Sequence, residues 1–179
     1  LSNLTAGTYT VTVKDNVSGC TVVGAFVVNT PDPLEITAVV NDVNCFNQST
    51  GDINITVTGG SNPRTYSWSN GATTQDLNNV VAGTYTVQVN APVGCSATRT
   101  FTIDQPQEAL DASAVVSNVE CFNTATGAID VTVWGGTAPY FYSWDSGQST
   151  QDISNLTAGS YNLTITDSRG CTFNLPLTV

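Results

Sequence analysis

The stretch TYSWSNGATTQDL, residues 65–77, returns 76 residues later as FYSWDSGQSTQDI, residues 141–153. A strand that carries a core Trp is typical of β-sandwich domains, and Asn-Gly or Ser-Gly after it is a turn signal. The stretch therefore predicts a core strand, a tight turn and a segment that leads into the next strand. It indicates that the chain builds the same core twice.

The repetition extends far beyond this stretch. Aligning residues 34–103 with 110–179 gives 30 identities in 70 positions, and both cysteines of each repeat fall into register. A fixed period of this kind is the sequence signature of a tandem array. We expect a piece cut from a longer protein, with three parts: the C-terminal part of one repeat (1–30), a first whole repeat with its linker (31–103), and a second whole repeat with its linker (104–179).

The composition excludes several classes of protein. The net charge is −10 and there are only four basic residues, so no basic surface is available to neutralise nucleic-acid phosphates. No apolar run approaches the roughly 20 residues of a membrane-spanning helix. Hydrophobic residues make up 40 % of the chain, which is enough for folded repeats. A repeat of about 70 residues is near the lower limit for a self-sufficient core, so we expect additional staples.

Strand signals dominate the pattern. Short runs rich in Val, Ile, Thr and Tyr are broken by Gly, Pro and Asn, and residues 52–58 alternate cleanly between apolar and polar side chains. The prediction for the first whole repeat is a set of six strands, copied 76 residues later, at 35–43, 52–58, 64–69, 73–78, 82–90 and 95–103. Short antiparallel strands with frequent turns predict an all-β fold of Ig-like sandwiches, arranged end to end because the linkers are short.

Four aromatic residues are predicted to mark the two cores. Trp68 and Trp144 lie on the third strand of each repeat, where sandwich domains commonly place a core Trp. Tyr85 and Tyr161 follow an Ala-Gly pair at the entry to a later strand. This resembles the tyrosine corner, in which the phenol bonds back to the backbone.

The combination of Gly-Gly-x-x-Pro, Tyr-Ser-Trp-x-x-Gly, Ala-Gly-Thr-Tyr and Gly-Cys, at these spacings, resembles the SprB repeat. The likeness covers both whole repeats and the partial one. The chain is also similar to PKD domains, although Ser-Asn-Gly or Asp-Ser-Gly replaces their acidic glycine motif after Tyr-Ser-Trp. The SprB resemblance implies a very long cell-surface adhesin of gliding bacteria, exported by the type IX pathway.

Catalysis finds no support in the residue inventory. The chain has no His and no Gly-x-Ser-x-Gly elbow, so the usual nucleophile–base pairs cannot form. Asp76 and Asp152 recur once per repeat, as structural residues would. We therefore expect a protein that is not an enzyme and that needs no cofactor.

Acidic residues crowd the two linkers and suggest a candidate for Ca²⁺ binding. The candidates are Asp32, Glu35, Asp104, Glu108 and Asp111. Oxygen-rich junctions between sandwich repeats can hold Ca²⁺. The alternative is a solvated acidic linker, because no EF-hand spacing is present and a zinc site lacks its His and Cys-x-x-Cys ligands.

A second candidate site is aromatic. Relative to the first repeat, the second has Trp134, Tyr140 and Phe141 where the first has Thr58, Arg64 and Thr65. An exposed aromatic patch marks an interaction site. Three interpretations stay open: it stacks on polysaccharide, it packs against a neighbouring repeat or an adjacent chain, or it is simply exposed.

The cysteines leave two disulfide pairings open. Closure within each repeat pairs Cys45 with Cys95 and Cys121 with Cys171, and this is the pairing we favour from the sequence. In an Ig-like sandwich, however, the two cysteines of a repeat lie about 25 Å apart, at opposite ends of a strand. That geometry favours a staple between neighbours, Cys45 to Cys171. Either pairing indicates an oxidising, extracellular location.

These observations predict a stalk of neighbouring repeats that presents an adhesive surface away from the cell. Two alternatives remain open at this stage. One is a module that itself binds surface polysaccharide. The other is a building block of an extracellular filament, with other copies packed alongside.

Overall fold

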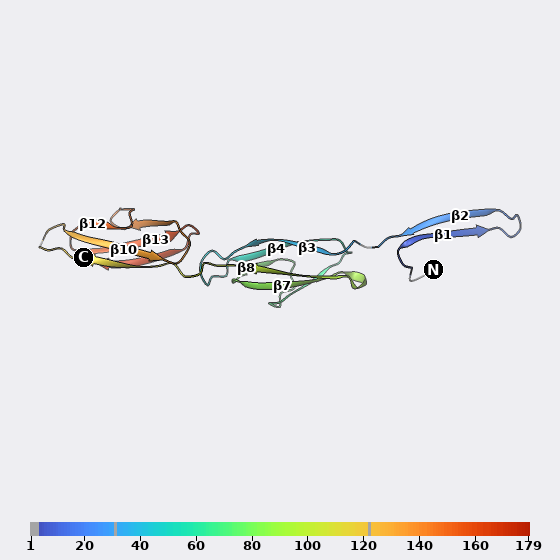
Figure 1. Cartoon of the computed structure of the whole chain (residues 1–179), viewed down its shortest axis with the longest axis horizontal. Coiled ribbons are helices and arrows are strands. Elements are labelled where there is room, and N and C mark those ends of the chain that lie inside the picture. Colours follow the sequence, from blue (N-terminus) through green and yellow to red (C-terminus); the bar gives the residue numbers. More distant parts are fainter. Residues whose placement is uncertain (1–3, 31, 122) are drawn as a thin grey trace.

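The structure is a computed structural model that describes residues 4–30, 32–121 and 123–179. It is nearly all β, and its parts follow one another along one axis (Figure 1). This confirms the predicted fold class of antiparallel β-sandwich repeats arranged end to end. Residues 1–3 of the expected partial repeat lie outside the described residues.

The N-terminal part is a single hairpin. Strand β1 (Gly7–Lys14) pairs antiparallel with β2 (Thr21–Val28) along its whole length. The hairpin corresponds to the last two strands of each whole repeat, and Tyr9 donates a hydrogen bond to Thr5 O (2.7 Å) as in a tyrosine corner. Most of its apolar side chains, such as Val22 and Phe26, are exposed.

Each whole repeat packs two three-stranded sheets face to face. The first has sheets β3-β4-β6 and β5-β7-β8, and the second has the corresponding sheets β9-β10-β12 and β11-β13-β14. The strands of the first repeat are β3 (Glu35–Asn41), β4 (Gly51–Thr58), β5 (Thr65–Trp68), β6 (Leu77–Val80), β7 (Gly83–Asn90) and β8 (Ser96–Ile103), with the short 3₁₀ turn η1 (Pro92–Gly94) before β8. Those of the second are β9 (Asp111–Ser117), β10 (Gly127–Trp134), β11 (Tyr140–Trp144), β12 (Ile153–Leu156), β13 (Ser160–Asp167) and β14 (Thr172–Thr178).

The two cores are built on equivalent residues. Trp68 and Trp144 are each 3 % exposed, and their indole nitrogens donate to equivalent carbonyls, those of Thr74 and Thr150 (both 2.9 Å). A buried Trp whose N–H has a partner is the expected arrangement. Each repeat has its own cluster of buried residues, so it buries apolar surface without sharing a core with its neighbour.

The tyrosine corners are present in both repeats. Tyr85 donates to Val81 O (2.8 Å) and Tyr161 donates to Thr157 O (3.0 Å). Tyr85 is buried and Tyr161 is half-buried. In each repeat, the hydrogen bond joins the Tyr near the start of β7 or β13 to the segment that leads into the same strand.

The strand predicted at 73–78 is shorter and later than expected, because side chains replace part of its ladder. Before β6, Asp76 accepts a hydrogen bond from Ile55 N (2.8 Å) and Gln75 donates to Ile55 O (2.9 Å). Asp152 accepts in the same way from Val131 N (2.8 Å). These recurring carboxylates are therefore structural, and regular pairing begins only at Leu77.

The Gly-Gly turn of each repeat fastens the linker that precedes the repeat. Gly60 N donates to Asp32 O (2.8 Å), and Gly136 N donates to Glu108 O (3.0 Å). At Gly135 (φ +67°), an added Cβ would lie 1.8 Å from Ala109 O. Only glycine allows the linker to approach so closely.

The candidate functional site at the junction between the repeats

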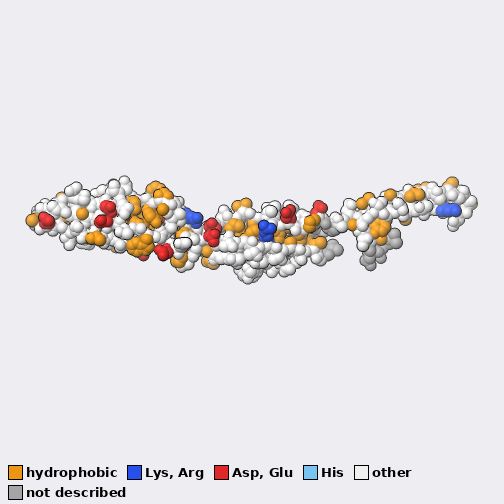
Figure 2. Space-filling view, in the orientation of Figure 1, with side chains coloured by type: hydrophobic (Ala, Val, Ile, Leu, Met, Phe, Trp, Pro, Cys, Tyr) orange, Lys and Arg blue, Asp and Glu red, His pale blue; other side chains and the backbone are white. Residues whose placement is uncertain are grey.

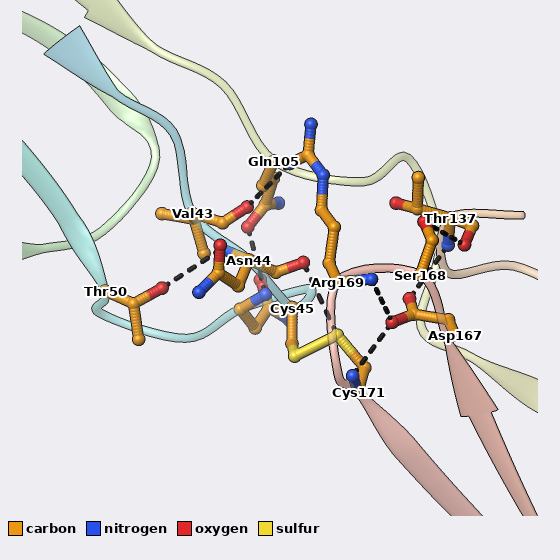
Figure 3. Close-up of a disulfide and its surroundings, with 11 residues drawn as sticks. Val43, Asn44, Cys45, Thr50, Gln105, Thr137, Asp167, Ser168, Arg169 and Cys171 are labelled. Carbon is orange, nitrogen blue, oxygen red and sulfur yellow. Dashed lines mark hydrogen bonds between the residues drawn. A yellow bond between two sulfur atoms is a disulfide. The ribbon is translucent and has the colours of Figure 1, made fainter.

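Two loops meet where the first repeat ends and the second begins (Figure 3). One loop connects β3 to β4 and carries Cys45. The other is the turn between β13 and β14, which carries Arg169 and Cys171. Because the strands run along the long axis (Figure 1), the loop and the turn lie at the facing ends of the two sandwiches. Segments that are far apart in the sequence therefore meet there.

A disulfide joins these loops. Cys45 and Cys171 are bonded, with a Cα–Cα distance of 5.7 Å, within the ordinary range for disulfides. The favoured pairing within each repeat, Cys45–Cys95 and Cys121–Cys171, is wrong. The physical reason is the length of the strands, which holds the two cysteines of one repeat at opposite ends of its sandwich.

The Cys171 turn is organised by a buried carboxylate. Asp167 is only 2 % exposed. Its Oδ1 accepts hydrogen bonds from Arg169 N (2.9 Å) and Cys171 N (2.8 Å), and its Oδ2 accepts from Thr137 N (2.9 Å). Three charge-assisted hydrogen bonds hold the turn in the shape that presents the sulfur to the first repeat.

Asp167 was not predicted as a site residue, because the first repeat has Ala91 at the same position. The partial repeat offers a signal that could have identified it. There Asp15 accepts hydrogen bonds from the Ser18 hydroxyl and from Val17 N, and these bonds lower the pKa of Asp15. An Asp that starts this turn therefore occurs in two of the three copies.

Arg169 adds a polar contact across the junction. Its guanidinium donates to Val43 O (3.1 Å), and Val43 N donates to Asp104 O (2.9 Å) on the linker. Val43 is completely buried, and Cys45 packs against the core of the second repeat. The loop, the linker and the turn thus form one contact region.

The junction is nevertheless not a continuous core. A hollow of about 400 Å³ lies beside the disulfide, and its walls include Phe46, Leu110 and Arg169. The main packing between strands occurs within each repeat. The disulfide, the linker and a few polar contacts therefore provide most of the connection between the two repeats.

The three aromatic candidates separate into two roles. Trp134 is 41 % exposed and Phe141 is 60 % exposed, so both are available for contact. Tyr140 is half-buried and donates to Gly135 O (2.7 Å). It therefore supports the Gly-Gly turn rather than the exposed patch. Val115, which the sequence analysis did not select, is 72 % exposed.

Figure 2 shows hydrophobic side chains grouped on the face of the second repeat that is turned to the viewer, on a surface with few charges. Val115 and Trp134 belong to the sheet β9-β10-β12, whereas Phe141 belongs to the other sheet, β11-β13-β14. We call these three exposed side chains the apolar surface residues of the second repeat. In the first repeat, Thr58 and Thr65 stand in place of Trp134 and Phe141.

The carboxylates proposed for Ca²⁺ do not form one site. Throughout the part of the chain that the structure describes, no group of three or more acidic, Cys or His side chains is placed to hold a metal ion. Asp32 and Glu108 serve the fold through their backbone carbonyls, which accept from the Gly-Gly turns. The five acidic residues are spread along the two linkers and the strands that follow them.

Three cysteines remain as thiols in the described structure. Cys20 and Cys121 are exposed, and Cys95 is half-buried. Within the described residues, no helix is both long and apolar enough to cross a membrane.

Two sandwiches of the same design, joined end to end by a linker and a disulfide, define a structural class of tandem β-sandwich repeats. The family model of the SprB repeat matches the chain at residues 37–73 and again at 113–149. Each match contains the first cysteine and the core Trp of one repeat. The chain therefore contains two SprB repeats, as the resemblance in the sequence predicted.

The SprB repeat is a structural repeat rather than an enzyme family, and it occurs in surface-exposed proteins of adhesin type. None of the curated proteins compared with the chain matches it.

Proposed function

We propose that this chain is a load-bearing spacer, the stalk of a cell-surface adhesin, which holds an adhesive part away from the cell. The observation that carries the proposal is the Cys45–Cys171 disulfide between two sandwiches that lie end to end. A linker alone would allow the repeats to hinge. A second covalent connection between them restricts that motion and keeps the axis extended.

The disulfide also changes how the chain would carry tension. Cys45 and Cys171 are 126 residues apart in sequence, yet one bond connects them. A pull on the two ends of the chain would pass through the sulfurs and bypass the segment between them. At about 3.4 Å per extended residue, the bypassed segment corresponds to roughly 400 Å of hidden length.

An extracellular location suits this role. Disulfides persist in oxidising compartments, and a surface stalk needs connections that survive there. The low content of charged side chains leaves a Thr- and Asn-rich surface with a net negative charge, which suits a spacer that is not itself the binding part. Export through the type IX pathway and a part in gliding motility are the finer expectations that accompany the family.

Force spectroscopy on the whole chain, tethered at its two ends, tests the proposal. With the disulfide intact, the unfolded extension should be short, because residues between Cys45 and Cys171 cannot lengthen. Reduction should add about 400 Å to the total extension. Small-angle scattering should give the profile of an elongated rod. A compact profile, with the repeats folded side by side, would contradict the spacer function.

A second candidate function rests on the apolar surface residues of the second repeat. Exposed aromatic side chains such as Trp134 and Phe141 can stack on the apolar faces of sugar rings, so this repeat is a candidate for binding surface polysaccharide. The first repeat supplies a matched control, because Thr stands at both equivalent positions.

A glycan array decides this candidate. The chain should bind a polysaccharide, and the double variant Trp134→Thr, Phe141→Thr should lose that binding while it keeps its melting temperature. If the chain binds no glycan on the array but the variant loses self-association, these side chains pack against other chains in a filament instead.

A further inference from the structure

The loop that carries Cys45 has a defined internal structure. Gln48 N donates to Cys45 O (3.1 Å), and Asn44 N donates to the hydroxyl of Thr50 (3.0 Å). Within this loop, Asn47 adopts a left-handed backbone conformation, with a φ of 58°. This conformation presents the sulfur of Cys45 at the end of the sandwich.

The described residues of the loop that carries Cys121 make the same hydrogen bonds without a disulfide. Thr124 N donates to Cys121 O (3.2 Å), and Glu120 N donates to the hydroxyl of Thr126 (3.1 Å). Asn123 has a φ of 58°, as in the first repeat. The outer end of the second repeat therefore presents the sulfur of Cys121 on a loop with the same hydrogen bonds as the Cys45 loop, although no partner is bonded to it.

On the other side of the staple, the Cys95 turn shares the backbone conformation of the Cys171 turn, although Ala91 stands in place of the Asp167 carboxylate. In the turn that carries Cys171, Asp167 N donates to Cys171 O (2.9 Å); in the turn that carries Cys95, Ala91 N donates to Cys95 O (2.8 Å). The glycine before each of these cysteines has a φ of 85° and 81°, respectively. The end of the first repeat that faces away from the second thus carries the matching half of the same contact.

The outer end of the second repeat also has space for an incoming linker. A hollow of about 310 Å³ lies there, lined by Val119, Asn123, Thr124, Thr157 and Ala158. At the equivalent end of the first repeat, Gln105 of the linker accepts a hydrogen bond from Asn47 N (2.9 Å). The hollow therefore corresponds to the place that a linker occupies when another repeat follows.

We infer that the Cys121 end of the second repeat is a docking face for a further SprB repeat, whose second cysteine bonds to Cys121. The Cys95 turn is the matching face for the first cysteine of another repeat. The inference rests on the proposed spacer function and extends one observed disulfide into a rule for the array: the first cysteine of each repeat bonds to the second cysteine of the next.

Formation of the bond needs an oxidant, and a small-molecule or protein disulfide serves. The thiolate of Cys121 attacks one sulfur of that disulfide, forms a mixed disulfide and releases a thiol. The thiolate of the partner cysteine then attacks Cys121 Sγ and displaces the second thiol. The two cysteines lose two protons and two electrons, and the oxidant is reduced to two thiols.

The rule gives the array an unusual covalent structure. The segment from Cys95 to Cys121, which contains β8, the linker and β9, would be bonded to a neighbour at both ends. Tension would pass along such segments and through the disulfides that connect them. The other strands of every repeat would be shielded from load.

The experiment extends the chain by one repeat, with a copy of residues 104–179 joined after Val179 so that the period is kept. The purified, oxidised protein is digested without reduction, its cross-linked peptides are identified by mass spectrometry, and its free thiols are titrated. The natural Cys45–Cys171 peptide pair is the internal control for folding and oxidation.

The inference predicts a Cys121 peptide bonded to the copied second cysteine. It also predicts three free thiols, against five if only the Cys45–Cys171 bond forms. The matched variant Cys121→Ser should leave the copied second cysteine free. A bond within the added repeat, or a free Cys121 beside an intact Cys45–Cys171 pair, would overturn the inference.

Scattering on the same protein separates this inference from the proposed function. A free Cys121 in an elongated particle would overturn the array rule and leave the spacer function standing. A bonded Cys121 in a compact particle would support the array rule and overturn the spacer function.

Discussion

At the scale of residues, equivalent positions perform one task with different chemistry. Arg64 donates from its guanidinium to Val57 O (2.8 Å) and Gly59 O (2.6 Å) in the first repeat. In the second, the Tyr140 hydroxyl donates to Gly135 O (2.7 Å). Both side chains satisfy the Gly-Gly turn to which the linker binds. A difference between repeats therefore does not by itself mark a binding site, which is why Tyr140 was wrongly grouped with the exposed aromatics.

The core Trp of each repeat should be the most costly residue to truncate. Trp144→Ala removes a buried side chain and the partner of the Thr150 carbonyl, so we expect a loss of about 3–5 kcal/mol in the free energy of unfolding. Denaturant titration followed by circular dichroism measures it. Trp134→Ala is the matched control, because the exposed Trp134 should cost less than about 1 kcal/mol. Equal effects of the two substitutions would contradict the core assignment.

Asp167 should stabilise the turn that carries Cys171. In Asp167→Ala, three backbone N–H groups lose their acceptor, and we expect a loss of about 2–4 kcal/mol for the second repeat. Thermal denaturation of the variant measures this loss, and hydrogen exchange at Thr137, Arg169 and Cys171 locates it. The exposed Asp145→Ala is the control. Unchanged exchange at those three amides would show that the carboxylate does not hold the turn.

At the scale of elements, the 76-residue repeat and the alternation of apolar and polar side chains were enough to predict most strands. The core Trp strands, the tyrosine corners and five of the six strands in the first repeat were predictable from alternation, turn residues and the repeat itself. The remaining strand, predicted at 73–78 and observed as β6, was placed too early, because the side chains of Gln75 and Asp76 bond to the backbone of Ile55. Sequence alternation cannot reveal a ladder that side chains replace.

The Gly-Gly turns were recognised as a motif, but their task was not predictable. It depends on contact with a linker that lies 26–28 residues earlier in the sequence. An added Cβ at Gly135 would overlap Ala109 O, whereas an added Cβ at Gly147 would meet nothing within 4 Å, although both residues have positive φ.

This contrast gives a prediction about the linker. Gly147→Ala should cost about 1–2 kcal/mol from backbone strain alone, and Gly135→Ala should cost more, because the linker must also move. Melting temperatures of the two variants measure the difference. Amide exchange at Gly136, which bonds to Glu108 O, reports whether the linker has been released. Equal melting temperatures would contradict the proposed linker contact.

At the scale of the whole molecule, the order and direction of the repeats follow from the sequence, but the disulfide pairing does not. Closure within each repeat would use Cys45, Cys95, Cys121 and Cys171, whereas the staple uses only Cys45 and Cys171. General experience favours closure within one unit. Strand length decides against it, because it separates the cysteines of one repeat and brings those of neighbouring repeats together. Only the three-dimensional position of both ends shows that Cys45 and Cys171 face each other.

Removing the staple should release the motion of the repeats without unfolding them. In Cys45→Ser, each repeat keeps its own core, so both should remain folded while they reorient independently about the linker. NMR relaxation should then give a separate rotational correlation time for each repeat, whereas the natural chain should tumble as one elongated body. Cys95→Ser, which changes a free cysteine, is the control. Unchanged tumbling of Cys45→Ser would show that the linker alone fixes the junction.

The most direct test of the account is the disulfide map of the natural chain, digested without reduction and analysed by mass spectrometry. The account predicts one cross-linked pair, the peptides that contain Cys45 and Cys171, with Cys20, Cys95 and Cys121 recovered as thiols. Recovery of Cys45 bonded to Cys95, together with Cys121 bonded to Cys171, would contradict it. The repeats would then be closed units joined only by their linker.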